Sequence, residues 1–112
     1  MVQLSARLDT AFSALSDATR RQLLQRLGKR DASISELASA FDMTLTGMKK
    51  HVQVLEDAGL VITEKVGRVR TCRLGARKLH DEQAWIAEYQ AVLEARYDRL
   101  EAFLERTQGD DT

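Results

Sequence analysis

The chain has 112 residues, and its 17 Lys and Arg residues balance its 17 Asp and Glu residues. This length suits one domain, residues 1–112, and the sequence has neither a signal-peptide pattern nor an apolar run of about 18 residues, so we expect a cytoplasmic protein without a membrane partner. A single cysteine excludes an internal disulfide and a thiol metal cluster, and the absence of proline favours a mainly helical fold.

Charge is distributed unevenly along the chain. Residues 1–80 contain 14 Lys and Arg against 8 Asp and Glu, whereas residues 81–112 contain 3 against 9. A basic body joined to an acidic final segment predicts a nucleic-acid surface on the first part only. The alternative is chance clustering of charges on an ordinary protein surface.

Two helices are predicted at the start of the chain. Leu8, Ala11 and Phe12 recur at helical spacing, which predicts an amphipathic helix over about residues 3–16. Asp17 is a good N-cap for a second helix, which should end at Gly28. In this second helix we expect a leucine face toward the core, formed by Leu23, Leu24 and Leu27. We expect the arginines to lie outward or along the edge, where they either solvate the surface or contact phosphates: Arg20, Arg21 and Arg26.

A helix-turn-helix pattern follows at residues 33–61. Ser33 and Glu36 have the capping-box spacing that begins a short helix. Residues 42–43 break this helix, and Thr44 can cap the next one through its hydroxyl. The second helix should stop at Ala58-Gly59, because glycine accepts the left-handed conformation that follows a helix C-terminus.

The second helix of this pattern has two contrasting faces. At 100° per residue an apolar stripe falls on one face and a polar, cationic stripe on the opposite face: Met48, Val52 and Leu55 against Thr46, Lys50 and Gln53, with Lys49 flanking the latter. Lysines and amides on the first turns are typical of a helix that enters the DNA major groove. The alternative is a lysine-bearing surface helix. Gly47 inside this helix is unusual, since glycine costs about 1 kcal/mol relative to alanine.

A β-hairpin is predicted next, with strands over about 60–66 and 69–74 around Gly67. Six cations occur from residue 65 to residue 78 with no acidic residue among them: Lys65, Arg68, Arg70, Arg73, Arg77 and Lys78. A ribbon with arginines at its tip suits a phosphate backbone or a minor groove. Alternatively, these cations protect an exposed sheet edge from pairing.

The chain ends in a helical pattern from residue 81 to about 106. Its apolar residues form a seam at steps of three and four: Trp85, Tyr89, Val92, Leu93, Tyr97, Leu100, Phe103 and Leu104. This face is too apolar to lie in solvent, so we expect it to pair with a second copy, helped by Leu8 and Phe12 of the first helix. Burial within one protomer is the alternative.

The order of these elements, and four of the segments, resemble the ArsR family of winged helix-turn-helix repressors. The matching segments are A-L-S-D-A-T-R-R-Q-L-L at 14–24, I-S-E-L-A at 34–38, K-H-V-Q-V-L-E-D-A-G-L-V at 50–61 and G-R-V-R-T-C-R-L at 67–74. With the final helix, the resemblance covers nearly the whole chain. The final helix is similar to that of a branch that lacks the family's metal sites.

The resemblance implies a mainly α fold with a hairpin wing and a long C-terminal dimerisation helix. It implies a homodimer that binds a palindromic operator in double-stranded DNA through a core at about 17–75, with dimerisation helices at about 3–16 and 81–106. The implied DNA contacts are Thr44, Thr46, Lys49, Lys50 and Gln53, with Arg68 and Arg70 at the wing tip. The implied dimer interface comprises Leu8, Phe12, Trp85, Tyr89, Leu93, Tyr97, Leu100 and Leu104. An inducer is unidentified.

The chain departs from the family's metal-binding members. Ala38 and Ala40 stand where arsenic- and cadmium-type members carry a Cys-x-Cys pair, and the last histidine, His80, precedes the final helix where zinc-type members place ligands. We therefore expect no metal and no cofactor. His51 is interpreted as a packing and hydrogen-bonding residue, with a metal ligand or pH sensor as the alternative.

The remaining chemical groups of the sequence are its single thiol and its histidines. Cys72 should be a partly inward small hydrophobe, although Arg70 and Arg73 could lower its pKa and make it redox-reactive. No catalytic constellation surrounds either histidine, so we expect no enzyme activity. If the protein is not a DNA-binding regulator, the alternative is a winged-helix interaction module for an acidic protein partner.

Overall fold

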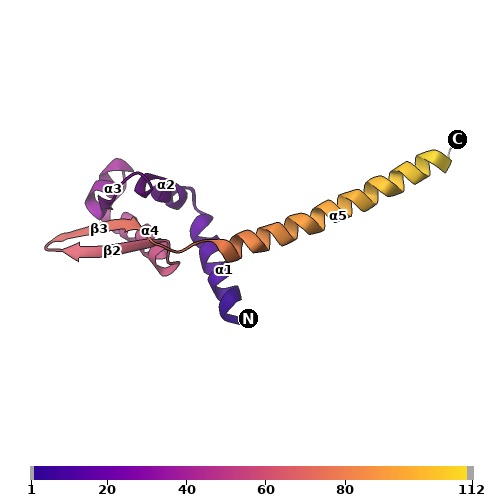
Figure 1. Cartoon of the computed structure of the whole chain (residues 1–112). Coiled ribbons are helices and arrows are strands. Elements are labelled where there is room, and N and C mark those ends of the chain that lie inside the picture. The colour runs from indigo at the N-terminus through magenta and orange to yellow at the C-terminus, as the bar shows by residue number, and fades with distance from the viewer. Residues whose placement is uncertain (1, 111–112) are drawn as a thin grey trace. The chain divides into compact units, whose positions relative to one another are not determined.

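The computed structural model describes the backbone of residues 2–110 and the side chains of residues 5–107. It divides into two compact units, residues 1–78 and 79–112. The first unit contains the helices α1 (Val2–Leu15), α2 (Ala18–Leu27), α3 (Ile34–Ala40) and α4 (Leu45–Asp57). Its strands are β1 (Ala32–Ser33), β2 (Val61–Val66) and β3 (Val69–Leu74), and the second unit is the single helix α5 (His80–Asp110) (Figure 1). The mainly helical, winged architecture expected from the sequence is confirmed.

The helix starts follow from local capping. Asp17 caps α2, Ser33 caps α3 and Thr44 caps α4, each through a side-chain oxygen that accepts a backbone N–H three residues later. These bonds satisfy donors that a helix N-terminus otherwise leaves unpaired. After α4, Gly59 has φ +76°, which is the left-handed conformation expected there.

The sheet of the first unit is antiparallel in the order β1-β3-β2. The β2–β3 hairpin lies at residues 61–66 and 69–74, close to the predicted strands, with Val66 opposite Val69 at its tip. The prediction of two strands was incomplete, because Ala32 pairs with Cys72 and adds the short strand β1. Within the unit, the hairpin projects beyond the helices as a wing (Figure 1).

The core of the first unit lies between α1–α4 and the base of the wing. Its largest fully buried side chains come from α2, α3, α4, β2 and β3: Leu23, Leu37, Met48, Leu55, Val61 and Cys72. Burial of such side chains contributes about 1.5–3 kcal/mol each for the larger aliphatic ones, so this core fixes the position of α4 and the wing.

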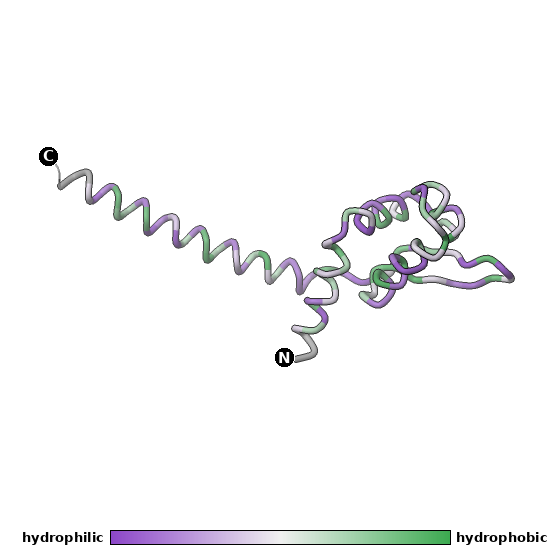
Figure 2. Tube along the Cα trace, turned by 180° about the vertical axis from the view of Figure 1, so that it is seen from behind, coloured by the Kyte–Doolittle hydropathy of each residue, from purple (hydrophilic) through white to green (hydrophobic). Residues whose placement is uncertain are grey.

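The second unit is a helix with an open apolar face. Trp85, Tyr89 and Tyr97 are 49%, 53% and 65% exposed, and the two rings of Trp85 and Tyr89 stack with centroids 5.7 Å apart. Apolar residues recur along the whole described helix (Figure 2). The helix begins one residue earlier than expected and extends past residue 106. No helix among the described residues is both long and apolar enough to cross a membrane.

Candidate nucleic-acid interface

The two faces of α4 separate as the sequence predicts. Met48, Val52 and Leu55 are at most 3% exposed, whereas the polar side chains of the opposite face are exposed to solvent. These exposed side chains are Thr46, Lys49, Lys50 and Gln53. The buried stripe anchors the helix on the core, so the cationic stripe is presented at the surface.

Two residues of this helix are partly engaged within the protein. The hydroxyl of Thr44 accepts the N–H of Gly47 at 3.0 Å as the helix cap. The amide Nε2 of Gln53 donates to Oδ1 of Asp57 at 2.8 Å. A DNA contact by Gln53 would therefore replace an existing hydrogen bond. Glycine at position 47 avoids a close contact, because a Cβ there would lie 3.1 Å from the Thr44 hydroxyl oxygen.

The wing turns at Gly67 and Arg68. Gly67 has φ +62°, while Arg68 is not among the described residues with positive φ, and this combination of signs is that of a type II′ hairpin turn. Val66 and Val69 on either side are 66% and 52% exposed. The tip is therefore an exposed arginine between two exposed valines.

Hydrogen bonds tie the base of the wing to α4. Nη1 of Arg70 donates to Oγ1 of Thr63 at 3.0 Å, and this hydroxyl donates to Oε1 of Glu56 on α4 at 3.1 Å. On the same strands, Nη1 of Arg73 pairs with Oε2 of Glu64 at 3.3 Å. Thr63 thus links the wing to α4 and its hydroxyl also accepts from Arg70, while Arg73 belongs to an exposed cross-strand ion pair.

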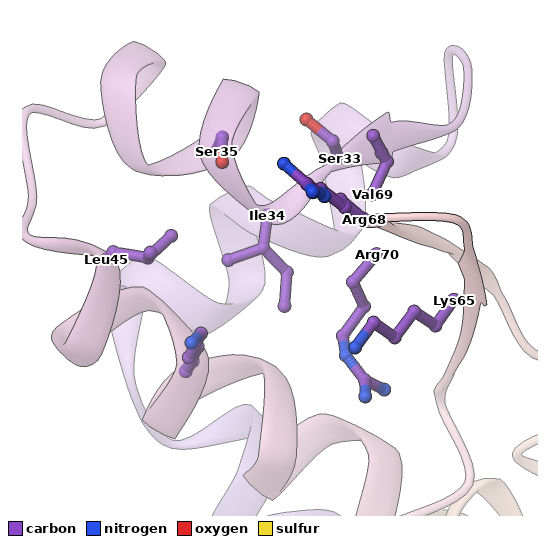
Figure 3. A pocket seen from close by; sticks show the side chains of 9 residues that line it. Ser33, Ile34, Ser35, Leu45, Lys65, Arg68, Val69 and Arg70 are labelled. Atoms are coloured by element: carbon purple, nitrogen blue, oxygen red, sulfur yellow. The ribbon is translucent and has the colours of Figure 1, made fainter.

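An open hollow of about 350 Å³ lies between the helix-turn-helix and the wing. Figure 3 shows Ile34, Ser35 and Leu45 of the helices on one side and Lys65, Arg68 and Arg70 of the wing on the other. Its lining contains four cations and no acidic residue: Lys49, Lys65, Arg68 and Arg70. A neighbouring hollow shares Lys49 and Arg70 and also includes Gln53 and Glu56.

Most of these cations have no partner among the residues that the structure describes. In the described part of the chain, no hydrogen bond or ion pair engages the side chains of Lys49, Lys65 and Arg68, nor that of Lys50 on the same helix. Unpaired cations that share one concave surface favour an anionic ligand there. The geometry is suited to a phosphate backbone, since the hollow is lined by both an exposed helix and a cationic ribbon.

The structure groups some of the expected site residues and separates others. Lys49, Arg68 and Arg70 line one hollow, whereas Thr46 and Lys50 are exposed on α4 outside it. Lys65 was not among the expected contacts, although it begins the acid-free cationic run that the sequence shows. Ser35 at the start of α3 also lines the hollow, and no pattern in the sequence singled it out.

His51 lies at a junction of helices, as its interpretation as a packing and hydrogen-bonding residue predicts. Its Nδ1 is 3.3 Å from Nη1 of Arg20 and 4.0 Å from Oδ1 of Asp17. Arg20 was expected to lie outward or along the edge of α2, and its part-buried guanidinium donates to backbone carbonyls at the end of α1. Arg21 likewise donates to the carbonyl of Leu15 at 2.7 Å. These two arginines therefore cap α1 instead of simply solvating the surface.

Cys72 is fully buried in β3. Burial is the largest effect on its thiol and, together with the negative charge of Glu56, raises the pKa to about 11. The opposing effect of Arg70 is smaller. Cys72 was interpreted as a partly inward hydrophobe, and the structure buries it completely. The alternative of a thiol activated by neighbouring arginines is wrong, because desolvation outweighs the nearby positive charge.

Comparison with known proteins identifies the family. A family model described as a helix-turn-helix domain matches residues 15–64. An HTH-type transcriptional regulator of Bacillus subtilis, YuzN, is 39% identical over 69 residues, which cover 55% of this chain and 75% of that protein. The transcriptional repressor SdpR of the same organism is 24% identical over 73% of this chain and 91% of its own length.

Solved structures agree with these relatives. The crystal structure of the ArsR family transcriptional regulator RHA00566 has 44% sequence identity and a TM-score of 0.72, covering 80% of this chain and 93% of that one. A homodimeric winged helix-turn-helix DNA-binding domain from Mycobacterium bovis, a possible ArsR-family regulator, has 26% identity and a TM-score of 0.59, covering 83% of this chain and 81% of that one. The present chain belongs to the ArsR family of winged helix-turn-helix transcriptional regulators.

Proposed function

We propose that the protein is a homodimeric repressor that binds a palindromic operator in double-stranded DNA. The observation that carries this proposal is the cation-lined hollow between α4 and the wing, whose unpaired lysine and arginine side chains are suited to phosphates. The repressor activity of one relative and the homodimeric state of a structural neighbour support the same conclusion.

In the proposed complex, α4 enters the major groove with its exposed face. Thr46, Lys50 and Gln53 contact base edges and Thr44 and Lys49 contact nearby phosphates, while Arg68 and Arg70 of the wing follow the backbone. Lysine is suited to the O6 and N7 acceptors of guanine, and glutamine to adenine. In this arrangement Lys50 contributes to sequence discrimination, and the wing arginines contribute to affinity for any duplex.

Dimerisation makes the two recognition helices act together. The exposed apolar face of α5 supports pairing with a second copy, since a face of this kind is rarely left in solvent. Two recognition helices about 34 Å apart would fit successive major grooves on one side of the duplex. A ligand or modification that rotates one protomer against the other would misalign them and release the DNA.

The proposal is tested with DNA from the region upstream of the protein's own gene. Fluorescence anisotropy should show salt-sensitive binding to a specific duplex. Lys50→Ala should relax discrimination at one base position by about 1–3 kcal/mol, whereas Arg68→Ala should weaken binding to all duplexes about equally.

Arg30→Ala is the matched control for lost charge, because Arg30 is exposed and does not line the hollow. Absence of any duplex preference, together with salt-sensitive binding to an acidic polypeptide, would instead support a protein-interaction module.

A further inference from the structure

One guanidinium group connects three helices of the first unit. Nε of Arg20 donates to the carbonyl oxygen of Ala14 at 2.9 Å, and Nη2 donates to that of Ser13 at 3.1 Å. Nη1 lies 3.3 Å from Nδ1 of His51 on α4. The backbone N–H of Arg20, in α2, donates to Oδ1 of Asp17 at 3.0 Å. The last carbonyls of a helix lack partners within it, so Arg20 satisfies the end of α1 while it binds α4.

A hydrogen bond within this pair requires one tautomer of the imidazole. Arginine remains protonated and can only donate, so a bond from its Nη1 requires Nδ1 of His51 to accept, with the ring proton on Nε2. His51 is half-buried, and its side chain is 22% exposed. It directly follows Lys50 in α4, so the hydrogen bond acts on the helix turn that carries the lysines proposed to contact DNA.

The contact also joins parts of the chain with different proposed tasks. Phe12 and Leu8 of α1 belong to the expected dimer interface, and Ser13 and Ala14 close the same helix. Arg20 therefore lies between the helix expected to contact the second copy and the helix expected to contact DNA. A change in the angle between these helices would change the separation of the two recognition helices in the dimer.

We propose that Arg20 and His51 are positioning residues for DNA recognition. Their hydrogen bond holds α4 at a set orientation to the C-terminal end of α1, and through it the dimer selects the spacing between operator half-sites. This inference rests on the proposed function, because it requires a dimer that binds DNA. It assigns neither residue a contact with DNA.

Arg21 provides a matched control. Its Nη1 donates to the carbonyl of Leu15 at 2.7 Å, so it caps the same end of α1. No described hydrogen bond or ion pair of Arg21 reaches α4. Arg21→Gln therefore removes a cap and a positive charge without removing the link to α4. At the other end of the link, His51→Asn retains an acceptor near Nδ1, whereas His51→Leu removes it.

The experiment measures affinity and spacing preference together. Duplexes are first selected by the wild-type protein from the region upstream of its own gene, and versions are then made with the half-sites moved apart by single base pairs. Arg20→Gln and His51→Leu should lose about 2- to 30-fold in affinity for the native spacing and discriminate less between spacings. Arg21→Gln and His51→Asn should retain both properties.

Several outcomes would overturn the proposal. One is an unchanged spacing preference in Arg20→Gln and His51→Leu; another is an equal loss in Arg21→Gln, which would indicate a simple capping or charge effect. If Arg20→Gln does not fold, the His51→Leu and His51→Asn pair decides by the same criterion. If the wild-type protein binds no duplex, the proposed function itself is wrong. If the wild type binds DNA but the variants keep its affinity and spacing preference, only this inference is wrong.

A measurement without DNA tests the geometry directly. Long-range ¹H–¹⁵N correlation spectra of wild-type protein should show an unprotonated, accepting Nδ1 and a protonated Nε2 in His51. This signature should change in Arg20→Gln and persist in Arg21→Gln. A ring proton on Nδ1 in the wild type would contradict the proposed hydrogen bond and overturn the inference.

Discussion

At the scale of single residues, the environment of Cys72 determines its reactivity. A rise in the thiol pKa from 9.0 to about 11 reduces the thiolate population about 100-fold at neutral pH, and the side chain is fully buried. Labelling of native protein with a disulfide reagent should therefore be at least that much slower than labelling of unfolded protein. Rapid labelling of the native state, accompanied by a change in DNA affinity, would show that the thiol is a redox sensor after all.

Asp17 should give the protein a defined response to acid. The backbone N–H of Arg20, which donates to its carboxylate, lowers the pKa of Asp17 below its ordinary value of 3.8. A lowered folded-state pKa means that the ionised carboxylate stabilises the fold above the unfolded-state value, and that this contribution disappears as the pH falls through the folded-state pKa.

Asp17→Asn isolates this effect, because asparagine can still cap α2 but does not titrate. Denaturant unfolding between pH 5 and pH 2 should show that the stability advantage of wild type over Asp17→Asn shrinks as the pH falls. A constant difference across this range would contradict the assignment.

At the scale of elements, the cap of α3 stabilises the first helix of the helix-turn-helix. Oγ of Ser33 accepts the N–H of Glu36 at 3.0 Å. Ser33→Ala should therefore lower the free energy of unfolding by about 1 kcal/mol. Ser39→Ala in the same helix removes no cap and should not be destabilising. Equal stability of the two variants in denaturant unfolding would argue against the cap.

The end of the wing makes a backbone contact that requires glycine. The N–H of Gly75 donates to the carbonyl of Leu60 at 2.9 Å, and a Cβ at position 75 would lie 2.5 Å from the carbonyl oxygen of Gly59. Gly75→Ala should therefore cost about 1–3 kcal/mol, as overpacking does. Gly28→Ala, at a helix end with ordinary right-handed geometry, is the control for a simple change of residue. A thermal unfolding midpoint of Gly75→Ala as high as that of Gly28→Ala would be inconsistent with this contact.

These elements differ in how far the sequence predicts them. The helix limits were predictable because Asp17, Ser33, Thr44 and Gly59 act through bonds to residues only a few positions away. The strand β1 was not, since two residues show no alternation and pair with β3 about forty positions later. The same limit applies to Arg20, whose contact with His51 crosses 31 positions. The positive charge of the hollow could be predicted from the acid-free run of cations in the sequence. Which residues line the hollow could not, because that depends on the tertiary fold.

At the scale of the whole molecule, dimerisation through α5 is the proposal most exposed to test. Leu100 lies on the open apolar face and is 52% exposed, whereas Ala102 lies on the opposite face at 100° per residue. Leu100→Glu should yield a monomer in light scattering at concentrations where wild type is a dimer, because it places a charge in the paired seam. Its operator affinity should fall too, since the two half-sites would no longer be bound by one dimer. Ala102→Glu should remain dimeric; loss of the dimer in both variants would not support this seam.

In the proposed complex, α4 and the wing form one cationic surface for DNA. The most direct measurement is the salt dependence of operator binding for wild type, Lys49→Ala, Arg68→Ala and the double variant, with Arg30→Ala as control. The slope of log K against log salt concentration should flatten by about 1 for each phosphate contact removed, additively in the double variant, and remain unchanged in Arg30→Ala. Equal slopes for all five proteins, or no binding by the wild type at low salt, would contradict the claim.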